Sequence, residues 1–166
     1  MAGWRRLLVA GIGALSLVGA GTISVAADGR GDRLIEFDSM TPITGSAVGA
    51  VNDRGITGGG APWSIVSGSG SVDRQGDVSV TVTGLIVAPL GRNPIGTFEA
   101  VVSCVTPHGI VNVETSGFAA TMPGGDSTIN AKVALPHPCK DPEVFVGGSP
   151  RGTFIWFARS NAEDDD

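Results

Sequence analysis

Strict alternation of apolar and polar residues marks the longest strands expected in this chain. Residues 77–83, DVSVTVT, place three valines on one face and hydroxyl or carboxyl side chains on the other. Residues 97–104 and 127–135 also set an apolar residue at every second position. A period of two is typical of a strand with one buried face. We therefore predict half-buried strands in these three segments.

Shorter apolar runs and regular turn signals complete the pattern. The runs cover residues 34–37, 63–66, 110–114, 144–146 and 154–158. Clusters of Gly, Pro, Asn and Ser predict turns at residues 68–70, 74–76, 93–94, 107–109, 123–126 and 147–150. About eight short strands with such punctuation, and no convincing helical stripe beyond residue 27, predict an all-β antiparallel sandwich. Both faces of 154–158 are apolar, which indicates a central strand or a partner surface.

The first 27 residues have the features of a secretory leader. Arg5 and Arg6 precede an uncharged run over residues 7–25, and small residues end at Ala27. This order predicts a signal peptide cut after Ala27, with a retained membrane anchor as the alternative. The exported part, residues 28–166, has the length of one domain. We expect a loose segment at its start, over residues 28–33, and a solvated acidic tail at its end.

Charge narrows the range of partners. The whole chain carries a formal charge of −5, and loss of Arg5 and Arg6 with the leader takes this to −7. The remaining basic residues form no patch. Nucleic acid and anionic membranes repel such a surface, so neither is expected as a partner. The expected location is extracellular, and the expected partner is an extracellular or cell-envelope molecule of unknown identity.

Two cysteines, Cys104 and Cys139, favour a disulfide, because a lone pair in an exported protein most often bonds. The chain-entropy model gives about 3–4 kcal/mol for a loop of this length. The alternative is a metal site that adds His108 and His137 to the two sulfurs. Zinc has the right ligand types there. Blue copper requires a histidine from an earlier strand, and no histidine precedes His108.

The stretch GITGGGAPW, residues 55–63, has the most unusual local composition. A phosphate loop requires Gly-rich backbone followed by a helix with Lys and Ser or Thr, and none of these follows here. One interpretation is a tight turn that leads into a strand beginning at a buried Trp63. The other is a glycine-lined ligand lip formed by Gly58, Gly59, Gly60 and Trp63.

Support for catalysis is weak in the sequence. No Gly-x-Ser-x-Gly elbow occurs, and both histidines lie in proline-containing turn segments. A pair of carboxylates could hydrolyse a substrate, and the candidates in or beside strands are Glu36, Asp38, Glu99, Glu114 and Glu143. Exposed strand faces carry such residues routinely. We assign no catalytic residue, no metal ligand and no cofactor.

Several segments together resemble a group of small exported bacterial proteins of unassigned function. They are residues 37–42, 54–63, 101–104, 135–139, 142–146 and 156–158. The abundance of Gly, Ala and Val, with Arg preferred over Lys, resembles an actinobacterial type of source. The resemblance covers most of residues 28–166 and implies no activity, cofactor or catalytic residue.

The sequence thus predicts a secreted or envelope-associated, non-catalytic binding or structural module of unknown ligand. A secreted hydrolase that uses a carboxylate or a histidine is the first alternative. A metal-binding protein that uses the Cys/His cluster is the second.

Overall fold

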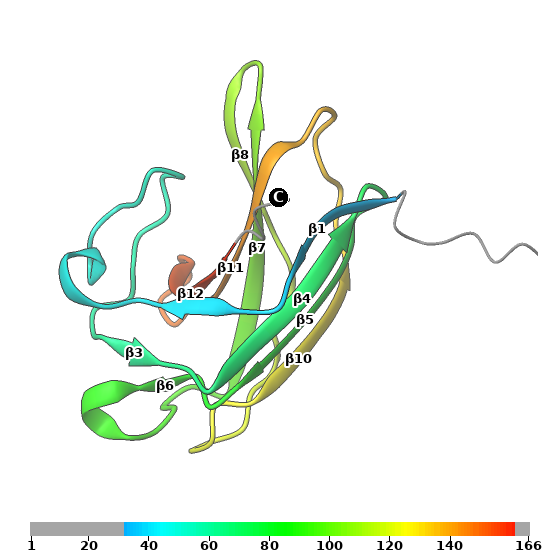
Figure 1. The fold of residues 1–166 in the computed structure, drawn as a ribbon. Helices are drawn as coiled ribbons and strands as arrows, with labels where there is room; N and C mark the ends of the chain where they lie inside the picture. The colour runs from blue at the N-terminus through cyan, green and yellow to red at the C-terminus, as the bar shows by residue number, and fades with distance from the viewer. Residues whose placement is uncertain (1–31, 162–166) are drawn as a thin grey trace, which may run out of the picture.

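The computed structural model describes residues 32–161 as antiparallel sheets packed face to face, which confirms the all-β sandwich (Figure 1). The expected leader and acidic tail lie outside these residues. One sheet has four strands, in the order β1 (Arg33–Phe37), β4 (Ser67–Asp73), β5 (Asp77–Thr83) and β10 (Ser127–Lys132).

The second sheet has six strands. Its main order is β2 (Met40–Pro42), β12 (Ile155–Ser160), β11 (Lys140–Gly148), β7 (Thr97–Thr106) and β8 (Gly109–Glu114), and β9 (Phe118–Ala119) also pairs with β7. A small two-stranded sheet joins β3 (Trp63–Ser64) to β6 (Ile86–Val87). Two short 3-10 turns are η1 (Gly45–Ala47) and η2 (Ala88–Leu90). No helix among residues 32–161 is long and apolar enough to span a bilayer.

The alternating segments form the strands that their pattern predicts. Strand β5 has the predicted bounds and buries its three valines while its polar side chains face outward. The turn expected at residues 68–70 is wrong, because these residues lie inside β4. At Gly70 a Cβ would lie 2.5 Å from the Ser79 carbonyl oxygen and 2.8 Å from the Phe37 ring. Glycine is therefore used here for close packing and not for a turn.

Residues 32–161 form 12 strands where about eight were expected. The additional strands are β4 and the short β2, β6 and β9, which have two or three residues each. Strand β1 begins at Arg33, so the last residue of the segment expected to be loose is part of the sheet.

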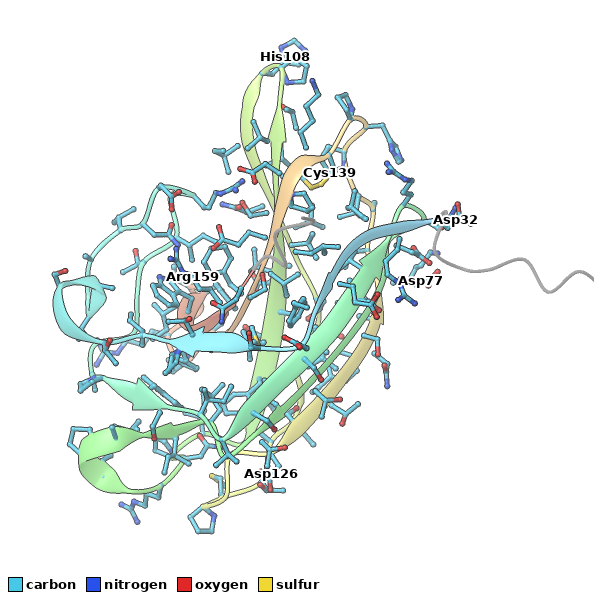
Figure 2. The ribbon with its side chains drawn as sticks, viewed as in Figure 1. Asp32, Asp77, His108, Asp126, Cys139 and Arg159 are labelled. Carbon is cyan, nitrogen blue, oxygen red and sulfur yellow. A yellow bond between two sulfur atoms is a disulfide. The ribbon has the colours of Figure 1, made fainter. Side chains whose placement is uncertain are left out.

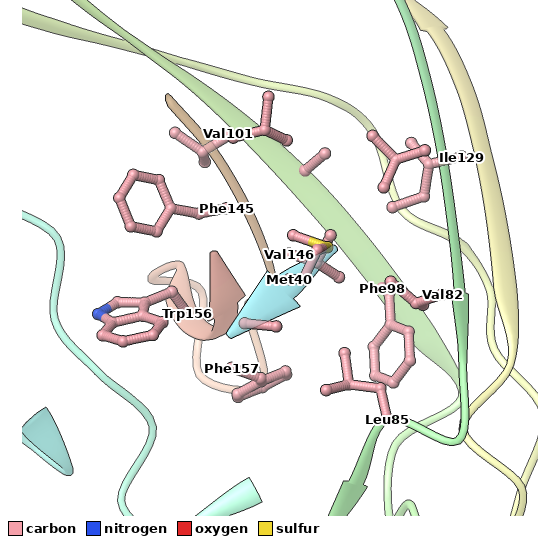
Figure 3. Close-up of a cluster of buried hydrophobic side chains, with 14 of the residues drawn as sticks. Met40, Val82, Leu85, Phe98, Val101, Ile129, Phe145, Val146, Trp156 and Phe157 are labelled. Atoms are coloured by element: carbon pink, nitrogen blue, oxygen red, sulfur yellow. The ribbon is translucent and has the colours of Figure 1, made fainter. Parts of the chain in front are cut away.

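Apolar side chains cover both faces of the six-stranded sheet. Between the two main sheets lie Val82 and Ile129 from one side and Phe98 from the other (Figure 3). Phe145 and Trp156 lie on the opposite side of the six-stranded sheet, with their rings in edge contact at 5.8 Å (Figure 3). The centre of this sheet is consequently buried on both faces, as the doubly apolar segment 154–158 indicates.

Candidate functional site

The glycine-rich stretch is a packing element in the structure. Trp63 is buried, and its ring stacks on Phe157 with centroids 3.9 Å apart. A Cβ at Gly58 would lie 2.3 Å from Ile43 Cδ1, and one at Gly59 would lie 3.0 Å from the Phe157 ring. At Gly60 a Cβ would have no neighbour within 4 Å. Of the four residues of the expected ligand lip, Gly60 alone faces open space.

Residues 48–62, which we call the lobe, form a hairpin-like loop over the outer face of the six-stranded sheet. The Gly49 amide donates to the Gly59 carbonyl at 3.0 Å, and the Gly58 amide donates to Ala50 at 2.8 Å. Two further bonds tie the lobe to β12: Gly59 donates to the Trp156 carbonyl, and Trp156 donates to the Thr57 carbonyl. The base of the lobe therefore continues the sheet at the β12 edge, and its tip folds over the outer face as far as Asn112 of β8.

The tip of the lobe is shaped by Asn52. Its side-chain oxygen accepts hydrogen bonds from the amides of Arg54 at 3.0 Å and Ile56 at 2.8 Å. Asn favours turns because it bonds to nearby backbone in this way. Gly55 follows Arg54 with φ of 74°, which glycine adopts without strain. The Arg54 carbonyl accepts a bond from Asn112 of β8 at 2.9 Å, which fixes the tip on the sheet.

The Arg54 side chain runs across the sheet to β11. Its Nη2 lies 2.7 Å from Asp141 Oδ2, and its Nε lies 3.2 Å from Glu143 Oε2. Arg159 of β12 approaches the other Glu143 oxygen at 3.5 Å. The Arg54 side chain is only 7% exposed, whereas that of Asp141 is 77% exposed. A charged network thus extends from a buried guanidinium to an exposed carboxylate.

An open pocket of about 320 Å³ lies over this network, and we call it the Arg54 pocket. Its lining residues are Arg54, Asp141, Pro142, Glu143, Arg159, Ser160 and Asn161. Burial raises the pKa of Glu143, and the nearby Arg159 and Arg54 oppose that rise. Both carboxylate oxygens of Glu143 face an arginine, so the pocket presents balanced charge.

Several buried polar atoms near the lobe have no hydrogen-bond partner among residues 32–161. They are Asn52 Nδ2, Arg54 Nη1, Ser103 Oγ and Trp156 Nε1. Ser103 on β7 pairs in register with Asn112 of β8 and Glu143 of β11, so it lies beneath the path of Arg54. Buried donors without partners are rare in folded proteins and call for an explanation at each site. All four belong to the lobe or to the sheet that it covers.

A second acidic cluster lies at the other end of this sheet face. The Ser149 hydroxyl lies 2.6 Å from Glu99 Oε2 and 3.2 Å from Glu114 Oε1. Burial, and then the adjoining Glu99, raise the pKa of Glu114. The structure thus brings together two of the five predicted carboxylates. Neither lines the Arg54 pocket.

Larger but shallower hollows lie on the outer face of the four-stranded sheet. One of them, of about 590 Å³, is open and lined mainly by polar side chains, including the exposed pair Asp77 and Lys132. Its bond to Lys132 lowers the pKa of Asp77. A smaller hollow, of about 300 Å³, is formed mainly by residues 135–140 and contains His137, and no carboxylate lines it to orient the imidazole. Neither hollow is lined by a buried charge, so the Arg54 pocket is the stronger candidate.

The two cysteines form the predicted disulfide, with their Cα atoms 4.8 Å apart. Both sulfurs proposed for a zinc or copper site are therefore bonded to each other. His108 lies at the tip of the β7–β8 hairpin (Figure 2). No cluster of three or more His, Cys, Asp or Glu residues among residues 32–161 is arranged to hold a metal ion.

No family model matches this chain, and no curated protein or solved structure matches it. The site therefore has to be interpreted from its own residues. Sequence reasoning named Glu143 among five carboxylates but missed Arg54, Asp141 and Arg159. The sequence does hold one indication of Arg54. Asn52 and Gly55 are typical turn residues, and the long side chain of Arg54 lies between them in the turn.

Proposed function

We propose that this chain is an exported or envelope-associated, non-catalytic binding module, and that the Arg54 pocket is its ligand site. The observation that carries the proposal is a guanidinium that is only 7% exposed, lines an open pocket and leaves Nη1 without an acceptor among the described residues. A buried charged donor without its acceptor is costly. Nη1 has no exposed surface in this conformation, so a ligand oxygen removes that cost only when the side chains around it open.

The charges around the pocket indicate the class of ligand. Two arginines and two carboxylates balance each other, so neither a strong anion nor a strong cation is favoured. Ser160 and Asn161 add groups that both donate and accept hydrogen bonds. Hydroxyl groups match such a mixture, because each hydroxyl is a donor and an acceptor. A saccharide of the cell envelope is the ligand class that we propose.

Saccharide binding tests the proposal directly. The assay measures the affinity of the exported chain for a panel of envelope oligosaccharides by calorimetry. We expect Asp141→Asn/Arg159→Gln to weaken binding by at least about ten-fold, because both side chains lie at the pocket mouth. The control is Asp77→Asn/Lys132→Gln, which removes an exposed acid–base pair on the other sheet. Equal affinity in both variants, or no binding across the panel, would contradict the proposal.

One observation favours the hydrolase alternative enough to test it. Glu143 has a raised pKa and lines a pocket, which is a feature of catalytic acids. Against this role, both of its oxygens face arginines. Mass spectrometry of the saccharides after incubation separates the two functions. A binding module leaves them intact, whereas cleavage that Glu143→Gln abolishes would establish a hydrolase.

Export is part of the proposal, and a mass measurement tests it. The leader pattern and the disulfide support an oxidising compartment. We expect the mature chain to begin at Asp28 and to gain two hydrogens on reduction. A mass that includes residues 1–27 would indicate that the leader is retained as an anchor.

A further inference from the structure

The hollow that contains His137 differs from the acidic surface around it, because its charged lining residues are both basic. It has a volume of about 300 Å³, and we call it the His137 pocket. Arg74 and Lys140 supply the charges, and His137 adds ring nitrogens that form hydrogen bonds. All three residues are exposed. The whole chain has a formal charge of −5, so its composition alone does not predict a basic pocket.

Neither cation of the His137 pocket is neutralised by another side chain among residues 32–161. Four other basic residues in this part of the chain form ion pairs, namely Arg33, Arg54, Lys132 and Arg159. Arg74 and Lys140 form none. The acidic neighbours of the two cations in the chain bond elsewhere. Asp73 accepts a hydrogen bond from a backbone amide of β5, and Asp141 pairs with Arg54.

Half-buried apolar residues line the rest of the pocket. Leu34, Leu135 and the disulfide-bonded Cys139 pack against the hydrophobic core, and Pro136 is half-buried beside them. A ligand that fills the pocket removes their remaining exposed surface from water, which favours binding. The lining thus combines an apolar part with two cations.

Three segments form the walls of the pocket, and bonds between segments fix them at the end of the sandwich where β1 begins (Figure 1). The Arg74 amide donates to the Asp32 carbonyl at 2.8 Å, which joins the β4–β5 turn to β1. The Val133 amide donates to the Gly76 carbonyl at 2.9 Å, which joins the same turn to the segment between β10 and β11. The disulfide at Cys139 joins that segment to β7. A site that is already formed loses less conformational entropy on binding.

Charge complementarity identifies the ligand as a small anion with an apolar part. Guanidinium and ammonium groups bind carboxylates and phosphates through charge-assisted hydrogen bonds. Salt screens charges that lie more than about 10 Å away, so the two cations at the pocket outweigh the more distant carboxylates. An anion without an apolar part would leave Leu34 and Leu135 in contact with water.

We propose that the His137 pocket binds a small amphipathic anion. Arg74 and Lys140 bind its carboxylate or phosphate head group, and Leu34 and Leu135 contact its apolar part. The His137 pocket shares no lining residue with the Arg54 pocket, so this inference does not rest on the saccharide proposal.

Calorimetry with hexyl phosphate and hexanoate, at concentrations below micelle formation, tests the proposal. We expect the tighter of the two to bind at least about ten-fold more tightly than hexanol or inorganic phosphate, because neither of these makes both kinds of contact. The tighter one also identifies the head group. Arg74→Gln/Lys140→Gln should weaken its binding at least about ten-fold. The control Arg92→Gln/Arg151→Gln removes the same charge from two basic residues outside the pocket and should bind like the wild type.

An amide nuclear magnetic resonance titration of the wild type locates the bound anion. We expect shifts at residue 74 and over residues 135–140, and none at residues 159–161 of the Arg54 pocket. Failure of both anions to bind, hexanol binding of equal strength, or shifts confined to other residues would overturn the proposal. An equal loss of affinity in the two double variants would also overturn it, because net charge alone would then explain the binding.

Discussion

Alanine at Gly58 should destabilise the protein strongly, and the structure gives the reason. The new Cβ would lie 2.3 Å from Ile43 Cδ1 and 2.5 Å from the Ala47 carbonyl oxygen. Ile43 is fully buried, so it has no free space to enter, and the carbonyl belongs to the backbone. Both contacts are far shorter than ordinary van der Waals separations. Overpacking of this kind costs about 1–3 kcal/mol, and we expect Gly58→Ala at the upper end.

The neighbouring glycines provide a graded series. A Cβ at Gly59 would lie 3.0 Å from Phe157, so Gly59→Ala should cost less than Gly58→Ala. Gly60 has open space and no positive φ, so Gly60→Ala should be neutral or stabilise by up to about 1 kcal/mol through the unfolded chain. Urea denaturation measures all three, with about 3 kcal/mol separating the first from the last.

The series would refute the packing interpretation if the order failed. Wild-type stability in Gly58→Ala would mean that the lobe does not pack on Ile43 as described. A large loss in Gly60→Ala would mean that its surroundings are filled. Gly60→Ala also tests the ligand-lip interpretation, because a loss of saccharide affinity without a loss of stability would place ligand beside Gly60.

Three further changes have expected outcomes. Replacing Cys104 and Cys139 by alanine should lower the free energy of unfolding by about 3–4 kcal/mol, because the disulfide closes a loop with a sequence separation of 35. A loss below about 1 kcal/mol in urea denaturation would contradict this. Glu114→Gln should stabilise the protein at pH 7. The pKa of Glu114 is raised in the folded state, so the wild type loses stability as the pH rises through that pKa, and the variant does not. A difference in stability between variant and wild type that does not change with pH would contradict this. Arg54→Met should cost about 3 kcal/mol, because Glu143 loses the closer of its two arginine partners and keeps only Arg159. Adding Glu143→Gln should recover part of that loss, and an additive double variant would contradict the pairing.

The sandwich was predictable because alternation reports burial directly. Strand β5 alternates at every position, and each valine faces the core. Strand β4 was not predictable in the same way, since its glycines signal turns when the sequence is considered alone. The Ser79 carbonyl oxygen and the Phe37 ring, on the two neighbouring strands, explain why Gly70 has no side chain. That contact is tertiary and leaves no local pattern.

The candidate site was less predictable than the fold. Glu143 could be named from its strand, but Arg54 and Asp141 are 87 positions apart in the chain. Arginine is usually exposed, so a buried Arg54 contradicts the residue's ordinary preference. The disulfide was predictable from the cysteine count together with the expectation of export. The turn around Asn52 and Gly55 can single out Arg54, but its pairing with Asp141 forms only when the lobe folds onto the sheet and leaves no local pattern.

The central claim, that the Arg54 pocket binds a saccharide, is tested most directly by an amide and indole nuclear magnetic resonance titration. The titrant is the oligosaccharide that binds most tightly in calorimetry. We predict shifts in the lobe, at residues 140–143 and 159–161, and at the indole N–H of Trp156 beneath the lobe. Shifts confined to the outer face of the four-stranded sheet, with none around Arg54, would contradict the account.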